Sequence, residues 1–120
     1  MSFVRKVEPK WVDNMVGGPG RVYNRSIIQS NEELYNSGRL FAHNVIEKGS
    51  GVGYHVHHGE CEFYYVLSGS AEYNDNGNVI TISAGDVTYT GDGEGHGLVN
   101  NADEPFEMIA LILFEKQKTE

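Results

Sequence analysis

Three of the chain's five histidines lie within four positions, at His55, His57 and His58, and Glu60 and Glu62 follow them. On a β-strand, side chains two residues apart point to the same face. His55 and His57 could therefore contact one metal ion, whereas His58 would point away. Exposed or hydrogen-bonded histidines would explain such a pair equally well, so the spacing alone indicates only a candidate metal site.

Glu62 lies five positions after His57, which would place the two side chains on opposite faces of an unbroken strand. Gly59 is the residue that can reset this alternation, because glycine tolerates the backbone of a turn or bulge. The sequence therefore predicts two strands here rather than one, with Glu62 returning to the face of His57. His58 and Glu60 are expected to be exposed at the turn, and Glu60 is an alternative ligand to Glu62.

His96 supplies a third imidazole in the stretch "GDGEGHGLVN". It follows a glycine-rich turn and opens a short apolar run, so it could face inward from the end of a strand. Three imidazoles and one carboxylate suit one divalent transition metal ion, namely Mn²⁺, Fe²⁺, Zn²⁺, Ni²⁺ or Co²⁺, whereas Ca²⁺ and Mg²⁺ prefer more oxygen ligands. A structural role for these histidines without metal is the alternative.

Other polar residues near these segments have weaker claims to a function. Tyr54 should face away from the histidine pair, so we expect it to pack against other side chains. His43 could face the mouth of a β-barrel, but we expect a structural role for it. Asp92 and Glu94 flank the turn before His96 and could supply a base at the rim of the site.

Residues that alternate with the strand after Gly59 are expected to form the walls of the site. Tyr64 and Val66 share the face of Glu62 and should line a cavity, because such pockets usually have apolar walls. Cys61 is the only cysteine, so it cannot form an internal disulfide, and we expect a small buried hydrophobe there.

Size and charge restrict the class of protein. A chain of 120 residues with 39% hydrophobic residues forms one domain with one core. Its formal charge of −8 disfavours nucleic acid and anionic membranes as partners. The sequence has no signal-peptide pattern and no apolar stretch near the roughly 18 residues of a membrane span. We expect a cytoplasmic protein.

Glycine-rich turns separate short runs rich in Val, Ile, Tyr and Phe, as in hairpins. "DNGN" at 75–78 contains an Asn-Gly pair typical of a type I′ turn. Ser30 and Glu33 predict a capping box that opens a short helical turn over 32–35, ended by Gly38. The expected strands cover residues 21–29, 40–47, 54–57, 61–67, 71–74, 78–82, 86–90, 97–100 and 106–114. The pattern predicts an all-β antiparallel barrel or sandwich with at most one or two short helical turns.

Two longer motifs give the chain a family resemblance. The stretch "GSGVGYHVHHGECEFYYVLSG" fits the pattern G(X)5HXH(X)3-4E(X)6G, and "GDVTYTGDGEGHGLVN" fits G(X)5PXG(X)2H(X)3N with Gly91 in place of proline. These are the two motifs of the cupin superfamily, and the surrounding residues resemble small single-domain cupins related to oxalate decarboxylase. The defined positions that match are Gly49, His55, His57, Glu62, Gly69, Gly85, Gly93, His96 and Asn100.

The resemblance implies a single antiparallel β-barrel of jelly-roll type. Residues 1–39 would form an N-terminal arm and the first strand or strands, 40–114 the barrel core, and 115–120 a C-terminal tail, all in one domain. It also implies that the metal ligands are His55, His57, Glu62 and His96, and that the protein forms a homodimer.

Four protein ligands on an octahedral ion leave two positions open, and a divalent ion with one carboxylate ligand keeps a charge of about +1. We therefore expect a small anionic ligand such as a carboxylate. One hypothesis is a metal-dependent decarboxylase, dioxygenase or isomerase. The alternative is a non-catalytic, metal-loaded module that binds or senses a small acid. A tetrahedral Zn²⁺ site closed by the same four ligands would be structural.

Overall fold

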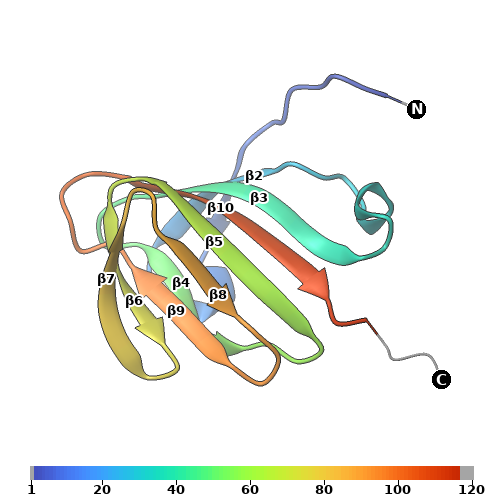
Figure 1. Cartoon of the computed structure of the whole chain (residues 1–120). Coiled ribbons are helices and arrows are strands. Elements are labelled where there is room, and N and C mark those ends of the chain that lie inside the picture. Colours follow the sequence, from blue (N-terminus) through green and yellow to red (C-terminus); the bar gives the residue numbers. More distant parts are fainter. Residues whose placement is uncertain (1, 117–120) are drawn as a thin grey trace.

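The computed structural model describes residues 2–116, which form strands and two short 3₁₀ turns (Figure 1). The expected all-β fold is confirmed. Within these residues, no helix has the length and apolar character needed to cross a membrane. The elements in chain order are β1 (Lys10–Asp13), η1 (Met15–Gly17), β2 (Arg21–Ser26), η2 (Asn31–Leu34), β3 (Gly38–Ile46), β4 (Gly51–Val56), β5 (Glu60–Ser68), β6 (Ser70–Asp75), β7 (Asn78–Ser83), β8 (Val87–Thr90), β9 (Gly95–Val99) and β10 (Phe106–Phe114).

Two antiparallel sheets face each other and enclose the core (Figure 1). One sheet has the order β1-β2-β3-β10-β5-β8 and the other the order β4-β9-β6-β7. Among the described residues the two sheets share no backbone ladder, so side-chain packing rather than hydrogen bonding closes the barrel. This is the jelly-roll type of architecture that the sequence predicted.

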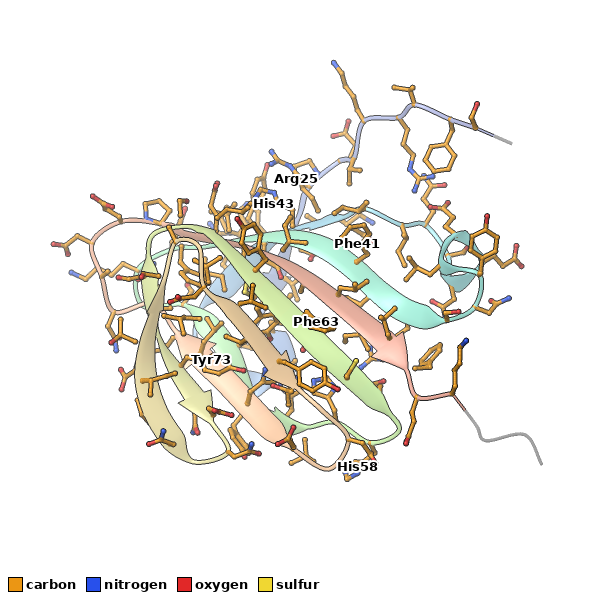
Figure 2. The ribbon with its side chains drawn as sticks, in the orientation of Figure 1. Arg25, Phe41, His43, His58, Phe63 and Tyr73 are labelled. Atoms are coloured by element: carbon orange, nitrogen blue, oxygen red, sulfur yellow. The ribbon has the colours of Figure 1, made fainter. Side chains whose placement is uncertain are left out.

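Strand alternation decides which side chains enter the core. Along β5 the residues Glu62, Tyr64 and Val66 are buried, and their neighbours along the strand are at least partly exposed. The same alternation along β10 buries Phe106, Met108, Ala110 and Ile112. Tyr73 from β6 completes this core from the opposite sheet (Figure 2). Cys61 is only partly buried, because it lies on the outward-facing side of β5, so the expected buried cysteine is wrong.

Turn chemistry explains the β6–β7 hairpin. Asn76 and Gly77 both have positive φ, 51° and 91°, and Asp75 pairs with Asn78 across the turn. This is the backbone of a type I′ turn, which requires positive φ at both central residues. The predicted hairpin is confirmed.

The helical turn near residue 32 lies where it was expected, but its capping differs. Ser30 occupies the N-cap position without a side-chain hydrogen bond, so the predicted capping box is wrong. Glu33 instead accepts hydrogen bonds from the guanidinium of Arg5, whose positive charge makes it the stronger partner. The turn ends at Tyr35, which has positive φ, and Gly38 begins β3.

The N-terminal region adds an edge strand, β1, that the sequence did not predict. Trp11 packs against Tyr23 of β2, with ring centroids 4.7 Å apart. Met15 of η1 packs against the core, and the next residue, Val16, has a φ of 51° that is unusual for a β-branched side chain. Gly53 of β4 accommodates η1, since a Cβ there would lie 2.0 Å from the Val16 carbonyl oxygen. The segment η1 therefore packs closely against β4, and its residues Met15 and Val16 line an internal cavity.

Candidate metal centre

A turn separates β4 from β5 at the position where the alternation of side chains required one. β4 ends at Val56, β5 begins at Glu60, and Gly59 between them has a φ of 71°. A side chain at that position would be strained, because L-residues rarely adopt this conformation. The break returns Glu62 to the face shared with His57, as the sequence predicted.

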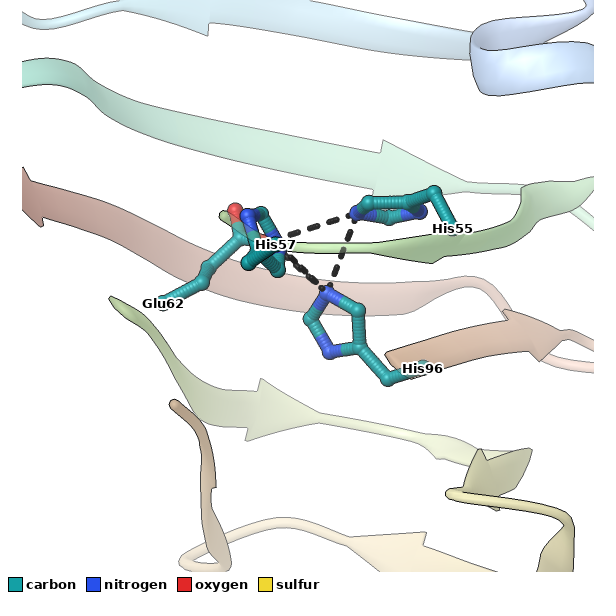
Figure 3. Close-up of side chains that lie close together, drawn as sticks. All are labelled: His55, His57, Glu62 and His96. Carbon is teal, nitrogen blue, oxygen red and sulfur yellow. Dashed lines mark hydrogen bonds and ion pairs between the residues drawn. The ribbon is translucent and has the colours of Figure 1, made fainter. Parts of the chain in front are cut away.

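Four side chains from three strands and one turn converge inside the barrel (Figure 3). His55 on β4 pairs directly with His96 on β9, which places their rings side by side. The Nε2 atom of His96 lies 3.1 Å from His55 Nε2, 3.2 Å from His57 Nε2 and 2.9 Å from Glu62 Oε1. The potential ligand atoms of all four residues lie within 4.8 Å of one another. The structure thus brings together the four residues that the motifs singled out.

The other ring nitrogens are held by hydrogen bonds that orient the histidines. His55 Nδ1 lies 2.7 Å from the carbonyl oxygen of Gly53, and His57 Nδ1 lies 2.6 Å from the Glu60 carboxylate. Carbonyls and carboxylates only accept, so these Nδ1 atoms donate and the Nε2 atoms carry lone pairs. His96 Nδ1 contacts the hydroxyls of Tyr73 and Thr90 at 3.0 and 2.9 Å. All three Nε2 atoms therefore point toward one place.

The spacing of the four ligand atoms fits a metal ion. Ligands bonded at about 2.1 Å lie about 3.0 Å apart when they meet at right angles, and about 3.4 Å apart in a tetrahedron. Three of the contacts within the cluster measure 2.9, 3.1 and 3.2 Å, and His55 Nε2 lies 3.8 Å from Glu62 Oε1. Three imidazoles and one carboxylate are also the donor set that divalent transition metals prefer. The cluster could hold such an ion.

Burial and charge favour the protonation states that a metal needs at Glu62 and His96, but not at His55. His57, Glu62 and His96 are 2%, 4% and 0% exposed. Burial raises the pKa of Glu62, but its interactions with His55 and His96 outweigh burial and hold that pKa at about 2. Burial lowers the pKa of His96, whereas the interaction with Glu62 raises the pKa of His55. Glu62 is thus a carboxylate and His96 a neutral imidazole near neutral pH, as ligation requires.

Glu60 is not the exposed residue that the sequence predicted. It is largely buried, because its carboxylate accepts a hydrogen bond from His57 and two from the Arg39 guanidinium, at 2.8 and 2.7 Å. Arg39 can reach it because β3 bulges there: Ile112 pairs with Leu40 and Leu113 with Gly38, which leaves Arg39 unpaired. Glu60 lies outside the four-residue cluster and orients His57, so it is not an alternative to Glu62.

Asp92 and Glu94, the candidates for a base at the rim of the site, accept hydrogen bonds from backbone N–H groups. The Asp92 carboxylate accepts a hydrogen bond from the Gly59 N–H at 2.7 Å, and Glu94 accepts one from the Gly91 N–H at 2.8 Å. Neither lines the cavity beside the cluster. Both hold turns, and Glu94 closes the turn in which the motif's proline is replaced by Gly91.

The remaining candidates point away from the cluster. His58 is exposed at the β4–β5 turn, as expected (Figure 2). Tyr54 is half-exposed on the other face of β4, which confirms its predicted orientation. His43 lies on the outer face of β3 with its Nδ1 3.4 Å from a guanidinium nitrogen of Arg25 (Figure 2). It does not face the barrel mouth.

A cavity of about 260 Å³ opens beside the cluster. His55, His57 and Glu62 form part of its wall, and Tyr64 lines it as predicted. Val66 is fully buried in the core but does not line the cavity, because Met108 and Ala110 of the adjacent strand β10 occupy that wall. A small molecule in this space would touch the three cluster residues that face it.

Comparison with known proteins identifies the family. The cupin domain family matches residues 42–112. A Thermotoga maritima protein named oxalate-binding protein is 40% identical over 108 residues, which cover 90% of this chain and 88% of that protein. The crystal structure of a Thermotoga maritima protein described as a predicted oxalate decarboxylase superposes with a TM-score of 0.89 at 39% identity, covering 94% and 99% of the two chains. A cupin 2 conserved barrel domain protein from Salinispora arenicola shares the fold, with a TM-score of 0.67 at 24% identity over 94% of this chain and 89% of that one. The chain belongs to the cupin family.

Proposed function

We propose that His55, His57, Glu62 and His96 bind one divalent transition metal ion, and that the bound ion holds a small carboxylate. The observation that carries this proposal is the convergence of three Nε2 atoms and one carboxylate oxygen, with the Nδ1 atoms engaged elsewhere. An octahedral ion with these ligands keeps two open positions and a charge of about +1, which suits an anion. A similar protein named oxalate-binding supports a small anionic ligand.

The cavity favours binding over acid–base catalysis. Apart from the cluster residues, the ionisable side chains in its wall are Arg39 and Tyr64. Arg39 is paired with Glu60, and burial raises the pKa of Tyr64 well above its ordinary value. A general acid or base works best when its pKa lies near the operating pH, which neither group satisfies. The geometry therefore best supports a metal-loaded module that binds or senses a small acid.

A metal-dependent decarboxylase, dioxygenase or isomerase is the second candidate. The similar structure described as a predicted oxalate decarboxylase favours it. When bound, the ion would act as a Lewis acid on a carbonyl or as a template for dioxygen. Turnover of small keto or dicarboxylic acids by metal-replete protein would make the protein an enzyme. Tight binding of one acid without turnover would support the binding module.

Elemental analysis of extensively dialysed protein tests the metal proposal. We expect one equivalent of Mn, Fe, Zn, Ni or Co in the wild type and its loss in His96→Ala, which removes the central ligand of the cluster. His58→Ala is the matched control, because this histidine is adjacent in sequence but exposed. It should retain the metal. A wild-type protein that takes up no metal even after reconstitution would refute the proposal.

Replacing Glu60 should weaken metal binding without removing a ligand. In Glu60→Gln the hydrogen bond to His57 and the ion pair with Arg39 lose their charge, so His57 is held less firmly. Such changes around ligating histidines typically lower metal affinity about 10- to 100-fold. Competition with a chromophoric chelator measures the dissociation constant. Glu72→Gln, an exposed carboxylate on β6, is the control, and an unchanged affinity in Glu60→Gln would contradict the orienting role of Glu60.

We also propose that the protein is a homodimer through the outer face of the six-stranded sheet. Contiguous exposed apolar side chains on a soluble protein mark an interaction surface. The row formed by His43, Ile109 and Tyr65 crosses this face without an acidic residue, so two chains of net charge −8 can meet there without repulsion between carboxylates in that row. A two-fold dimer would bury the same patch on both copies. The apolar residues of this face on β3, β5, β8 and β10 are Phe41, Phe63, Tyr65, Leu67, Val87, Tyr89, Ile109, Leu111 and Leu113.

A charge in the middle of this face should separate the copies. We expect wild-type protein to have twice the 13.3 kDa mass of the chain by light scattering after gel filtration. Tyr65→Glu should be a monomer, because an unpaired carboxylate would be buried in the interface. Val79→Glu, at an exposed apolar position of the other sheet, should stay dimeric. A monomeric wild type would refute the dimer.

A further inference from the structure

The cavity beside the cluster is larger than a ligand of oxalate's size requires. Liquid water occupies about 30 Å³ per molecule, so 260 Å³ corresponds to about nine waters. An oxalate ion has six heavy atoms and fills the space of about three waters. Even with a metal ion in place, much of the cavity would remain.

The remaining space has apolar walls and runs along β3. Leu40 is level with Ile112 and Glu62 across the sheet, whereas Asn44 is level with Met108. Four residues of a strand span about 13 Å, so the Asn44 end lies well beyond the cluster. Val52, Met108 and Ala110 form the wall between the two ends.

A pair of amides forms the polar end opposite the cluster. Asn44 is only 4% exposed, and its Nδ2 donates a hydrogen bond of 2.7 Å to Asn24 Oδ1. This is the only side-chain hydrogen bond of Asn44 within residues 2–116, and both amides line the cavity. The pair thus retains an acceptor at Asn44 Oδ1 and N–H donors on both amide nitrogens. Asn24 is partly exposed, and both amides line the cavity with hydrogen-bonding capacity to spare, which suits a ligand with a polar tail.

We propose that the ligand is a 2-oxo or 2-hydroxy acid with an apolar chain of about three carbons that ends in a hydroxyl or amide group. This inference rests on the proposed function, because the acid's head would sit on the ion held by the cluster. The chain lies along Val52, Met108 and Ala110. The polar tail meets Asn44 and Asn24.

Calorimetric titration of Mn²⁺-loaded protein under nitrogen tests the ligand class. The acids are oxalate, pyruvate, 2-oxopentanoate and 5-hydroxy-2-oxopentanoate. Each buried methylene strengthens binding about fourfold, so 2-oxopentanoate should bind about 15-fold more tightly than pyruvate. The terminal hydroxyl should add a further threefold to tenfold, the usual range for one net hydrogen bond.

Two variants distinguish the contribution of the ligand's apolar chain and polar tail from that of its acidic head. Ala110→Leu fills the middle of the cavity and should remove the preference for 2-oxopentanoate over pyruvate. Asn44→Leu should remove only the gain from the hydroxyl group. Melting temperature and metal content establish that each variant is folded.

The outcomes test the ligand class separately from the proposed binding of a carboxylate by the metal ion. If oxalate and pyruvate bind and the longer acids bind equally or more weakly, the ligand class is wrong and the metal-held carboxylate stands. If no acid binds to protein that holds its metal, both are wrong.

Discussion

His55→Ala should gain no stability when metal is added, whereas wild-type protein should gain it. A ligand that binds only the folded state stabilises it by about 4 kcal/mol at a thousand times its dissociation constant. For a chain of 120 residues, 1 kcal/mol shifts the melting temperature by about 4 °C. Saturating metal should therefore raise the wild-type melting temperature by about 15 °C.

His55 is the suitable ligand to remove because its side chain is the most exposed of the four, at 21%. Its loss leaves little unfilled space but removes an interaction that keeps Glu62 ionised, so metal-free His55→Ala should melt somewhat below metal-free wild-type protein. Scanning calorimetry of chelator-treated protein, with and without added Mn²⁺, measures both effects. His43→Ala, which removes a strand histidine outside the cluster, should keep the full metal-induced rise. An equal rise in His55→Ala would show that the metal binds elsewhere.

Much of the fold could be predicted because its signals are local. The Asn76–Gly77 turn needs only its own two residues to specify a hairpin. The alternation along β5 and β10 follows from which side chains prefer the core. In contrast, β1 and η1 have no periodic pattern, and distant contacts decide their positions. Trp11 is fixed by Tyr23 and Met15 by the core, so their own sequence does not specify a strand or a turn.

The residues of the candidate site could be predicted from the sequence to different extents. His55 and His57 follow from strand parity, and Glu62 follows once Gly59 breaks the strand. Residue spacing alone could not place His96 beside them, because that contact depends on the pairing of β4 with β9. The second motif supplied this through its family resemblance. What the motif pattern does not contain is the geometry of the Nδ1 contacts that orient the rings.

Arg39 and Glu60 show why the surroundings of the site were missed. Glu60 lies beside a turn, where a charged side chain is normally solvated, and the sequence therefore favoured exposure. Its burial depends on Arg39, which reaches it only because β3 bulges against β10. A bulge is a property of strand pairing and has no signal in the residues of β3 alone. The cavity end formed by Asn24 and Asn44 was missed for the same reason, since it requires the pairing of β2 with β3.

Asn100→Ala should be among the most destabilising substitutions although this residue is no metal ligand. Asn100 is fully buried where the chain leaves β9. Its Nδ2 donates to the carbonyl oxygens of Ile46 and Glu104, at 2.9 and 2.8 Å, and its Oδ1 accepts from the Ala102 N–H at 2.9 Å. Alanine would leave these backbone groups without partners. Each such group costs about 1 to 3 kcal/mol, so we expect the three together to lower the free energy of unfolding by about 3 kcal/mol or more.

Urea denaturation of Asn100→Ala measures this loss, and Asn101→Ala provides the control. Asn101 is exposed and makes one side-chain hydrogen bond, to Glu72, so its removal should change the free energy of unfolding by less than about 0.5 kcal/mol. Asn100 follows His96 by four residues on an extended strand, about 13 Å along the chain. Folded Asn100→Ala should therefore still bind one equivalent of metal. Loss of metal from a fully stable variant would mean that this motif residue acts on the cluster. Loss of stability with the metal retained would show that the second motif joins a candidate ligand, His96, to a residue that holds the end of its strand.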